Sequence, residues 1–210
     1  MHGYFETPCY PRGGFCKGQV TGVRSTPLIL FQAVIRRDAY TGEHARAVAR
    51  LCKLVGLEMG LPAHKRKMLI VGALLHDLGK LFVPNAILKK PGPLTPEERG
   101  IIEEHPVTGS RILEQYKLPL EVALIARHHH ERYDGSGYPQ GLSGEEIPLS
   151  ARIVQVVDAF DAMTRTRSYC RSISLAEALA EIERNTGSQF DPGVVRTFVK
   201  PSFLQHALPL

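Results

Sequence analysis

The residues VGALLHDLGK at positions 71–80 place a histidine and an aspartate next to each other at the end of an apolar run. Apolar residues recur every three or four positions from Ala63 onward, which predicts a helix with a buried face through to Lys80. A charged or polar group in such a place costs free energy unless a partner compensates it. His76 and Asp77 must therefore have partners, and these partners constrain how the rest of the chain folds.

The same helical period recurs along most of the chain and predicts an all-α fold. The predicted helices lie within residues 27–60, 63–80, 96–116, 119–130, 149–166 and 175–185. Two of them start with a predicted capping box, formed by Thr95 with Glu98 and by Ser174 with Glu177. Residues 131–149 are rich in Gly and Pro and are too long for an ordinary connection, which indicates a functional loop.

A length of 210 residues with 43% hydrophobic residues fits one compact domain. We expect an N-terminal extension at 1–27, the folded domain at 28–200 and a tail at 201–210. No window approaches the roughly 18 apolar residues of a membrane span, and the N-terminus has no signal-peptide core, so a cytoplasmic protein is expected. The net charge of +5 is scattered, which indicates a small anionic ligand as readily as nucleic acid, or only a solvated surface. A DNA or RNA partner is not expected.

The four cysteines have no disulfide-framework spacing, and reduced thiols fit the cytoplasm. Cys9 and Cys16 have the spacing of half a zinc site, but no second pair follows them. A zinc site there stays an open alternative.

Six histidines in or beside predicted helices, with two aspartates in apolar helices, form the candidate site. They are His44, His76, His105, His128, His129, His130, Asp77 and Asp158. Each alone is more often an ordinary hydrogen-bonded residue than a ligand. Together they supply imidazole and carboxylate, the ligands of Mn, Fe, Ni or Zn, whereas the lack of clustered thiols argues against structural zinc.

A pair of metals would compensate the buried His76-Asp77 pair. Neighbouring residues on a helix point about 100° apart, so adjacent ligands can reach two metals or two sides of one. Two metals about 3.5–4 Å apart that share Asp77 and a hydroxide would provide a nucleophile at neutral pH and bind a phosphoryl group.

Three motifs occur in a fixed order: HDLGK at 76–80, HHERYDGSGYP at 129–139 and ARIVQVVDAFDAMT at 151–164. Further stretches accompany them: RDAYTGEHARAVA at 37–49, ILKKPGPLTPEE at 87–98, EEHPVTGSRIL at 103–113 and FDPGVV at 190–195. Together they strongly resemble the HD-GYP family, a branch of the HD-domain metal-dependent phosphohydrolases. The resemblance implies an all-α HD-domain helical bundle with a long Gly/Pro-rich GYP loop. It also implies an iron or manganese centre that hydrolyses the bacterial second messenger cyclic di-GMP to linear pGpG. Whether pGpG is hydrolysed further to GMP stays open.

The resemblance also implies residue roles. One metal would be bound by His44, His76, Asp77 and Asp158, and Asp77 would bridge to a second metal bound by His105, His129 and His130. Lys80 lies four residues after His76 and so on the same face of the predicted helix, from which it would contact the substrate phosphate. Lys80 and Asp77 would be catalytic, unless Lys80 is only a cation at a helix end. Tyr138, Arg167 and Arg171 would bind the dinucleotide, whereas His128 would lie behind the ligands or at the surface.

Two positions depart from the family pattern. Members with three metals have a glutamate four residues before the first histidine ligand, where this chain has Tyr40. A tyrosine cannot replace a bridging carboxylate at neutral pH, so two metals are expected. Cys170 stands where the family often has a basic residue, and whether Arg171 compensates for it stays open.

Two other functions are weighed against this one. A catalytically weak module could act as a cyclic di-GMP sensor, or bind a diguanylate cyclase domain through residues 131–149; the complete ligand set argues against it. A related HD phosphohydrolase could act on another nucleotide, against which the DGSGYP motif argues only by analogy.

Overall fold

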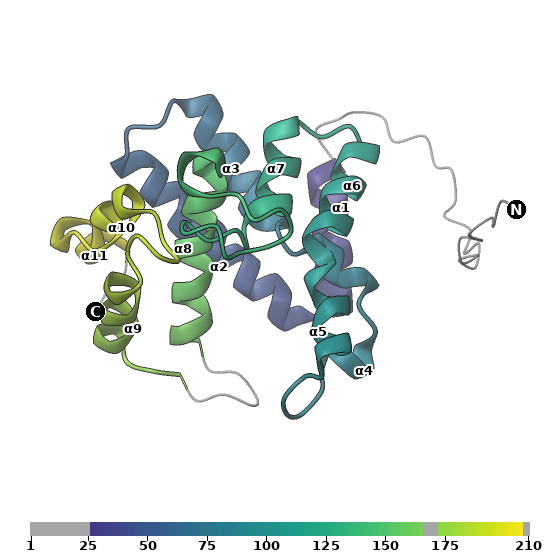
Figure 1. Cartoon of the computed structure of the whole chain (residues 1–210). Coiled ribbons are helices and arrows are strands. Elements are labelled where there is room, and N and C mark those ends of the chain that lie inside the picture. Colours follow the sequence, from purple (N-terminus) through teal and green to yellow (C-terminus); the bar gives the residue numbers. More distant parts are fainter. Residues whose placement is uncertain (1–25, 166–171, 208–210) are drawn as a thin grey trace, which may run out of the picture.

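The computed structural model describes residues 26–165 and 172–207, and these residues form a bundle of helices with no strand (Figure 1). The all-α prediction is confirmed. The α-helices are α1 (Thr26–Arg37), α2 (Ala39–Glu58), α3 (Ala63–Leu75), α4 (Asn85–Leu88), α5 (Pro96–Glu103), α6 (His105–Gln115), α7 (Leu120–His128), α8 (Leu149–Thr164), α9 (Leu175–Arg184), α10 (Pro192–Phe198) and α11 (Pro201–Ala207). Two short 3-10 helices are η1 (Leu78–Phe82) and η2 (Gly144–Glu146).

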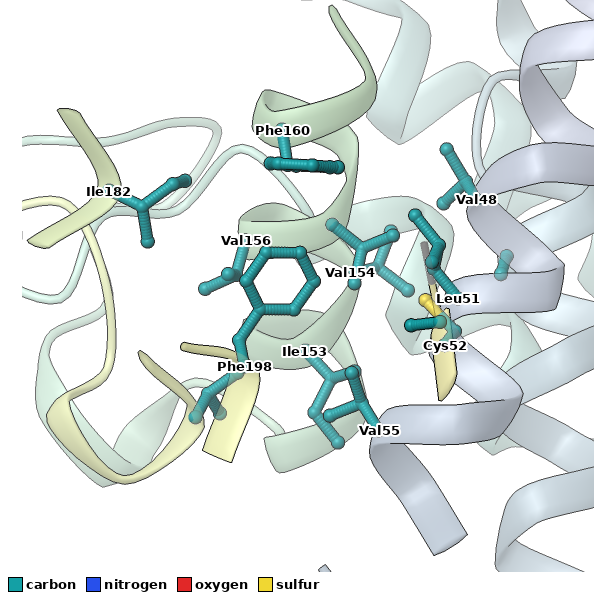
Figure 2. Close-up of a cluster of buried hydrophobic side chains, with 14 of the residues drawn as sticks. Val48, Leu51, Cys52, Val55, Ile153, Val154, Val156, Phe160, Ile182 and Phe198 are labelled. Atoms are coloured by element: carbon teal, nitrogen blue, oxygen red, sulfur yellow. The ribbon is translucent and has the colours of Figure 1, made fainter. Parts of the chain in front are cut away.

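The apolar side chains form two buried clusters. The larger one joins α2 and α8 to α9, α10 and α11, with Phe160 and Phe198 packed edge to face at its centre (Figure 2). The smaller one joins α1, α6 and η1. Helices α3 and α7 contribute to both clusters, so the residues that follow their C-terminal ends lie between the two cores.

Two long predicted helices are each broken once, so the prediction of continuous helices there is wrong. The first break is at Asp38, whose carboxylate caps α2 by accepting hydrogen bonds from the Thr41 N–H and hydroxyl. The second is at Glu104, between α5 and α6. Pro106 has no N–H for the carbonyl of Ile102, so an unbroken helix would leave that carbonyl without its partner. The apolar period runs through both breaks and does not reveal them.

The helix predicted through residue 80 ends at Leu75, so His76 and Asp77 follow α3 and Lys80 lies in η1. The prediction that Lys80 lies one helical turn above His76 is therefore wrong. The reason is the close packing of η1 on α6: a Cβ on Gly79 would overlap the His105 carbonyl. The backbone turns at this point to bring Gly79 against α6.

Other details of the predicted pattern hold. Both capping boxes, Thr95 with Glu98 and Ser174 with Glu177, are confirmed. Residues 131–148 contain only η2, as expected for a loop. By contrast, the tail expected from residue 201 contains α11, whose Phe203 and Ala207 are buried in the larger cluster. Among the described helices, none combines the length and apolar content needed to cross a membrane.

Candidate metal centre

Three of the predicted ligands lie just after the end of a helix, and the same hydrogen bond orients the ring of each. The Nδ1 atoms of His76, His105 and His129 each lie 2.7–2.9 Å from the carbonyl oxygen three residues earlier. These carbonyls belong to the last turns of α3, α5 and α7, where the usual intrahelical partners run out. Each Nδ1–H donates to its carbonyl, so Nε2 is the atom that each ring presents to a metal.

Asp77 lies among these Nε2 atoms. Its Oδ1 is 3.3 Å from His105 Nε2 and 3.8 Å from His129 Nε2, and its Oδ2 is 3.4 Å from His76 Nε2. Two groups of potential ligand atoms, each within 4.8 Å of one another, share Asp77. One group is His44, His76 and Asp77, and the other is Asp77, His105, His129 and His130. The structure therefore brings together seven predicted ligands, with Asp158 adjoining the first group.

The donor atoms fit divalent transition-metal ions. His76 Nε2 and Asp77 Oδ1 are buried and make no hydrogen bond within the described part of the chain. A buried polar atom without a partner costs about 1–3 kcal/mol, so two of them side by side require another partner. Imidazole nitrogen and carboxylate oxygen together match Mn, Fe, Ni or Zn.

Asp158 and His44 form a hydrogen-bonded chain with two residues that the sequence pattern did not single out. Asp158 Oδ1 is 2.9 Å from His44 Nε2 and 3.8 Å from His76 Nε2. On the other side of the ring, His44 Nδ1 is 2.6 Å from Asp161 Oδ2. Arg165 donates to both oxygens of Asp161. Asp161 therefore orients His44 from behind, and its spacing of three residues from Asp158 on α8 was the signal for this role.

Two cavities meet at this cluster. The larger, about 590 Å³, is lined by His44, Asp77, Asp158 and Lys80, and also by Lys89. Lys80 is 28% exposed, and its Nζ lies 2.8 Å from Asp77 Oδ2. The second cavity, about 400 Å³, shares His130 and Asp158 with the first. The cluster therefore forms the wall between two spaces large enough for parts of a ligand.

Comparison with known proteins identifies the fold. A family model described as HD domain matches residues 30–194, most of the chain. The chain belongs to the HD-domain family. Its motifs place it in the HD-GYP branch, as the sequence predicted.

Curated relatives agree with this assignment. The chain is 40% identical over 179 residues to a cyclic di-GMP phosphodiesterase response regulator of Xanthomonas campestris, which covers 84% of this chain and 47% of the relative. It is 45% identical over 166 residues to a cyclic di-GMP phosphodiesterase of Thermotoga maritima, covering 78% of this chain and 45% of the relative. It is also 38% identical over 160 residues to a 3′3′-cGAMP-specific phosphodiesterase of Vibrio cholerae, and the match covers 76% of this chain and 37% of the relative. The HD domain thus spans less than half the length of these relatives.

Solved structures show the same fold. A cyclic GMP-AMP-specific phosphodiesterase of Vibrio cholerae matches with a TM-score of 0.65 and 20% identity, over 88% of this chain and 50% of that one. An HD-GYP-type protein of Bdellovibrio bacteriovorus matches with a TM-score of 0.61 and 23% identity, over 73% and 49%.

The GYP loop of this HD domain is anchored by Glu131, a further residue that the sequence pattern did not single out. Its buried carboxylate accepts hydrogen bonds from the Gln140 N–H at 2.8 Å and the Leu142 N–H at 3.1 Å. His128 is also buried, with Nδ1 3.5 Å from Glu131 Oε1, and belongs to neither ligand group. A Cβ on Gly137 would overlap the backbone of Arg132, so this close turn requires glycine.

The anchored loop places Tyr138 beside the ligands. Its ring stacks on His130, with centroids 4.9 Å apart and 24° between planes, and it lines the second cavity. Burial raises the pKa of its hydroxyl well above the usual range, so Tyr138 stays neutral. Arg167 and Arg171 lie outside the described residues.

Charge at the HD-domain site is unevenly distributed. Burial alone would lower the pKa of His44, but its hydrogen bonds to Asp158 and Asp161 outweigh burial and raise it to about 9. Burial lowers the pKa of His129 to about 4. At neutral pH the His129 ring is therefore uncharged and its nitrogen can bind a metal directly, whereas His44 must first lose a proton. Metal binding at the His44 group should release a proton and weaken in acid.

Asp161→Ala is expected to weaken metal binding at the His44 group by about 10–100-fold, because the His44 ring loses the carboxylate that orients it. The group containing His105 and His129 should keep its affinity. Calorimetric titration with Mn²⁺ measures both, with Glu183→Ala, an exposed carboxylate on α9, as the matched control. Unchanged affinity at both groups, or equal losses at both, would contradict the assigned role of Asp161.

Proposed function

We propose that this HD domain is a metal-dependent phosphodiesterase that hydrolyses cyclic di-GMP to linear pGpG. The observation that carries the proposal is the shared position of Asp77: it belongs to both ligand groups and lines a cavity of about 590 Å³ that also contains Lys80. The names of the Xanthomonas and Thermotoga relatives support cyclic di-GMP as substrate. Further hydrolysis of pGpG to GMP is a separate outcome that the same assay measures.

The proposed cofactor is a pair of divalent transition-metal ions, iron or manganese. His44, His76, Asp77 and Asp158 would bind one, and Asp77, His105, His129 and His130 the other. When bound, such a pair supplies a nucleophile at neutral pH and stabilises charge on phosphoryl oxygens. Two ions rather than three are proposed because Tyr40 occupies the position of a further carboxylate.

The remaining proposed roles belong to four further side chains. Lys80 would neutralise charge that develops on the non-bridging phosphoryl oxygens, which is a major contribution to catalysis in such reactions. Tyr138, stacked on His130, offers a flat apolar face for a nucleobase in the second cavity. Arg167 and Arg171 are proposed to pair with a phosphate of the substrate, since a guanidinium can donate hydrogen bonds to two oxygens at once.

A second proposed partner is a diguanylate cyclase domain, bound through the loop at 131–149. The exposed side chains of Asp134, Ser136 and Gln140 provide polar surface on this loop. Such binding is compatible with hydrolysis and does not replace it.

The test is anaerobic purification with metal analysis, followed by turnover of cyclic di-GMP and 3′3′-cGAMP. We expect about two ions per chain, pGpG as product, loss of activity with a chelator and recovery with Fe²⁺ or Mn²⁺. If metal-loaded protein binds cyclic di-GMP but forms neither pGpG nor GMP, the domain is a sensor. Faster turnover of 3′3′-cGAMP would instead change the assigned substrate.

A further inference from the structure

The larger cavity is lined by two lysines in different settings. Lys80 lies next to the ligand groups and is paired with Asp77. Lys89 directly follows α4 and has an exposed side chain. Within the described part of the chain, no hydrogen bond or ion pair of the Lys89 side chain is formed. The cavity therefore has one lysine that is neutralised and one that is available to a ligand.

The backbone that carries Lys89 is fixed on its N-terminal side by Arg37. The Arg37 guanidinium donates hydrogen bonds to the carbonyls of Leu81 and Val83 and, at 3.2 Å, to Asn85 Oδ1. Asn85 is the first residue of α4, and its carbonyl accepts the Lys89 N–H at 3.0 Å. The start of α4 is thus held against the end of α1.

The C-terminal side is fixed by the next residue, Lys90. Its Nζ lies 2.6 Å from Glu98 Oε2, and Glu98 also closes the capping box of α5 with Thr95. Helices α4 and α5 contact each other (Figure 1). Between two anchored neighbours, the position of the Lys89 backbone is set, while its side chain stays free to contact a ligand.

We propose that Lys89 binds the second phosphate of the substrate, the one that is not hydrolysed. This proposal rests on the proposed function. A cyclic dinucleotide carries two phosphodiester charges on opposite sides of its ring, so when one lies at Asp77 and Lys80 the other lies away from them, and Lys89 is the lysine of the same cavity wall that is available to it. A flexible lysine ammonium suits a phosphate whose exact position is set by the rest of the ligand.

The consequence is selectivity for substrates with two phosphates. Lys80 would act on any phosphodiester at the metal ligands, whereas Lys89 would contribute only when a second phosphate is present. Both cyclic di-GMP and 3′3′-cGAMP carry two phosphates, so Lys89 would favour cyclic dinucleotides as a class and would not distinguish their bases.

The test compares Lys89→Met with wild type on two substrates, cyclic di-GMP and bis(p-nitrophenyl) phosphate, which has one phosphate. We expect the KM for cyclic di-GMP to rise about tenfold, as for the loss of one charge-assisted hydrogen bond, with little change for the single diester. Lys89→Arg should restore most of the affinity. Lys67→Met, an exposed lysine on α3 outside the cavity lining, is the matched control.

A second measurement separates this proposal from the proposed function. A hydrolysis-resistant phosphorothioate analogue of cyclic di-GMP is titrated into Mn²⁺-loaded wild type and Lys89→Met. About tenfold weaker binding by the variant supports the role of Lys89 even if wild type hydrolyses nothing. Equal binding and equal KM overturn it even if wild type is fully active, as does an equal loss on the single diester.

Discussion

Asp77→Asn is expected to abolish cyclic di-GMP hydrolysis, by at least about 10³-fold, and to remove metal from both ligand groups. Asp77 is the one residue common to both groups, and its two oxygens face different histidines. Burial opposes its charge, but the charges of Lys80 and His76 hold its pKa well below the usual range, so it is a carboxylate at neutral pH. An amide of the same shape keeps the packing and loses the charge that a bridging ligand needs.

Metal content and the Mn²⁺-dependent rise in Tm measure this effect without relying on activity. A metal that binds only the folded state and is present at 100 times its Kd adds about 2.7 kcal/mol to the free energy of unfolding. Wild type should show this gain, and Asp77→Asn should lack it. Glu183→Gln, an exposed carboxylate on α9, is the control for loss of one negative charge. Retention of two ions per chain by Asp77→Asn would show that Asp77 is not a shared ligand.

The helical period predicted where helices occur but not where they stop. At Asp38 and Glu104 apolar residues recur on both sides of the break, so their spacing does not mark it. Pro106 was the available signal: its missing N–H frees the Ile102 carbonyl, and the His105 ring takes its place at 2.7 Å. Helix breaks of this kind are what turn the histidine Nε2 atoms toward one another.

The ligand set came from motif resemblance, since spacing alone cannot bring residues 44, 77, 105 and 158 together. The residues behind the ligands were harder to find. Asp161 lies on the same helix as Asp158 and could be inferred from periodicity. Glu131 could not, because it lies in a loop without periodicity, and only the fold shows that its carboxylate is buried against the backbone of Gln140 and Leu142.

The position of Lys80 beside Asp77 does not depend on the helix that the sequence predicted. The sequence placed it on a helical face shared with His76, whereas the chain leaves the helix before His76 and continues in η1. The turn nevertheless brings Lys80 Nζ within 2.8 Å of Asp77 Oδ2 and into the wall of the larger cavity. Its proposed role therefore depends on the packing of Gly79 against α6, which the helical pattern does not contain.

Lys80→Met is expected to lower kcat by about 10²–10³-fold, because its ammonium would stabilise charge that is largest in the transition state. Metal content should stay near wild type, since Lys80 contributes no ligand atom and the ions themselves compensate the Asp77 charge. The KM for cyclic di-GMP should change less than kcat, which is the pattern for an interaction made mainly in the transition state. Lys67→Met is the control for loss of an exposed lysine.

The comparison with Asp77→Asn separates a catalytic role of Lys80 from a structural one. If both residues merely held the cluster together, the two variants would lose metal and activity in parallel. If Lys80 acts on the phosphate, only Asp77→Asn loses metal, and Lys80→Met stays metal-loaded but slow on cyclic di-GMP and on bis(p-nitrophenyl) phosphate alike. Lys89→Met should slow only the first of these substrates, so the three variants separate metal binding, phosphoryl stabilisation and second-phosphate recognition within one cavity. Wild-type turnover in a fully metal-loaded Lys80→Met protein would exclude Lys80 from the reaction.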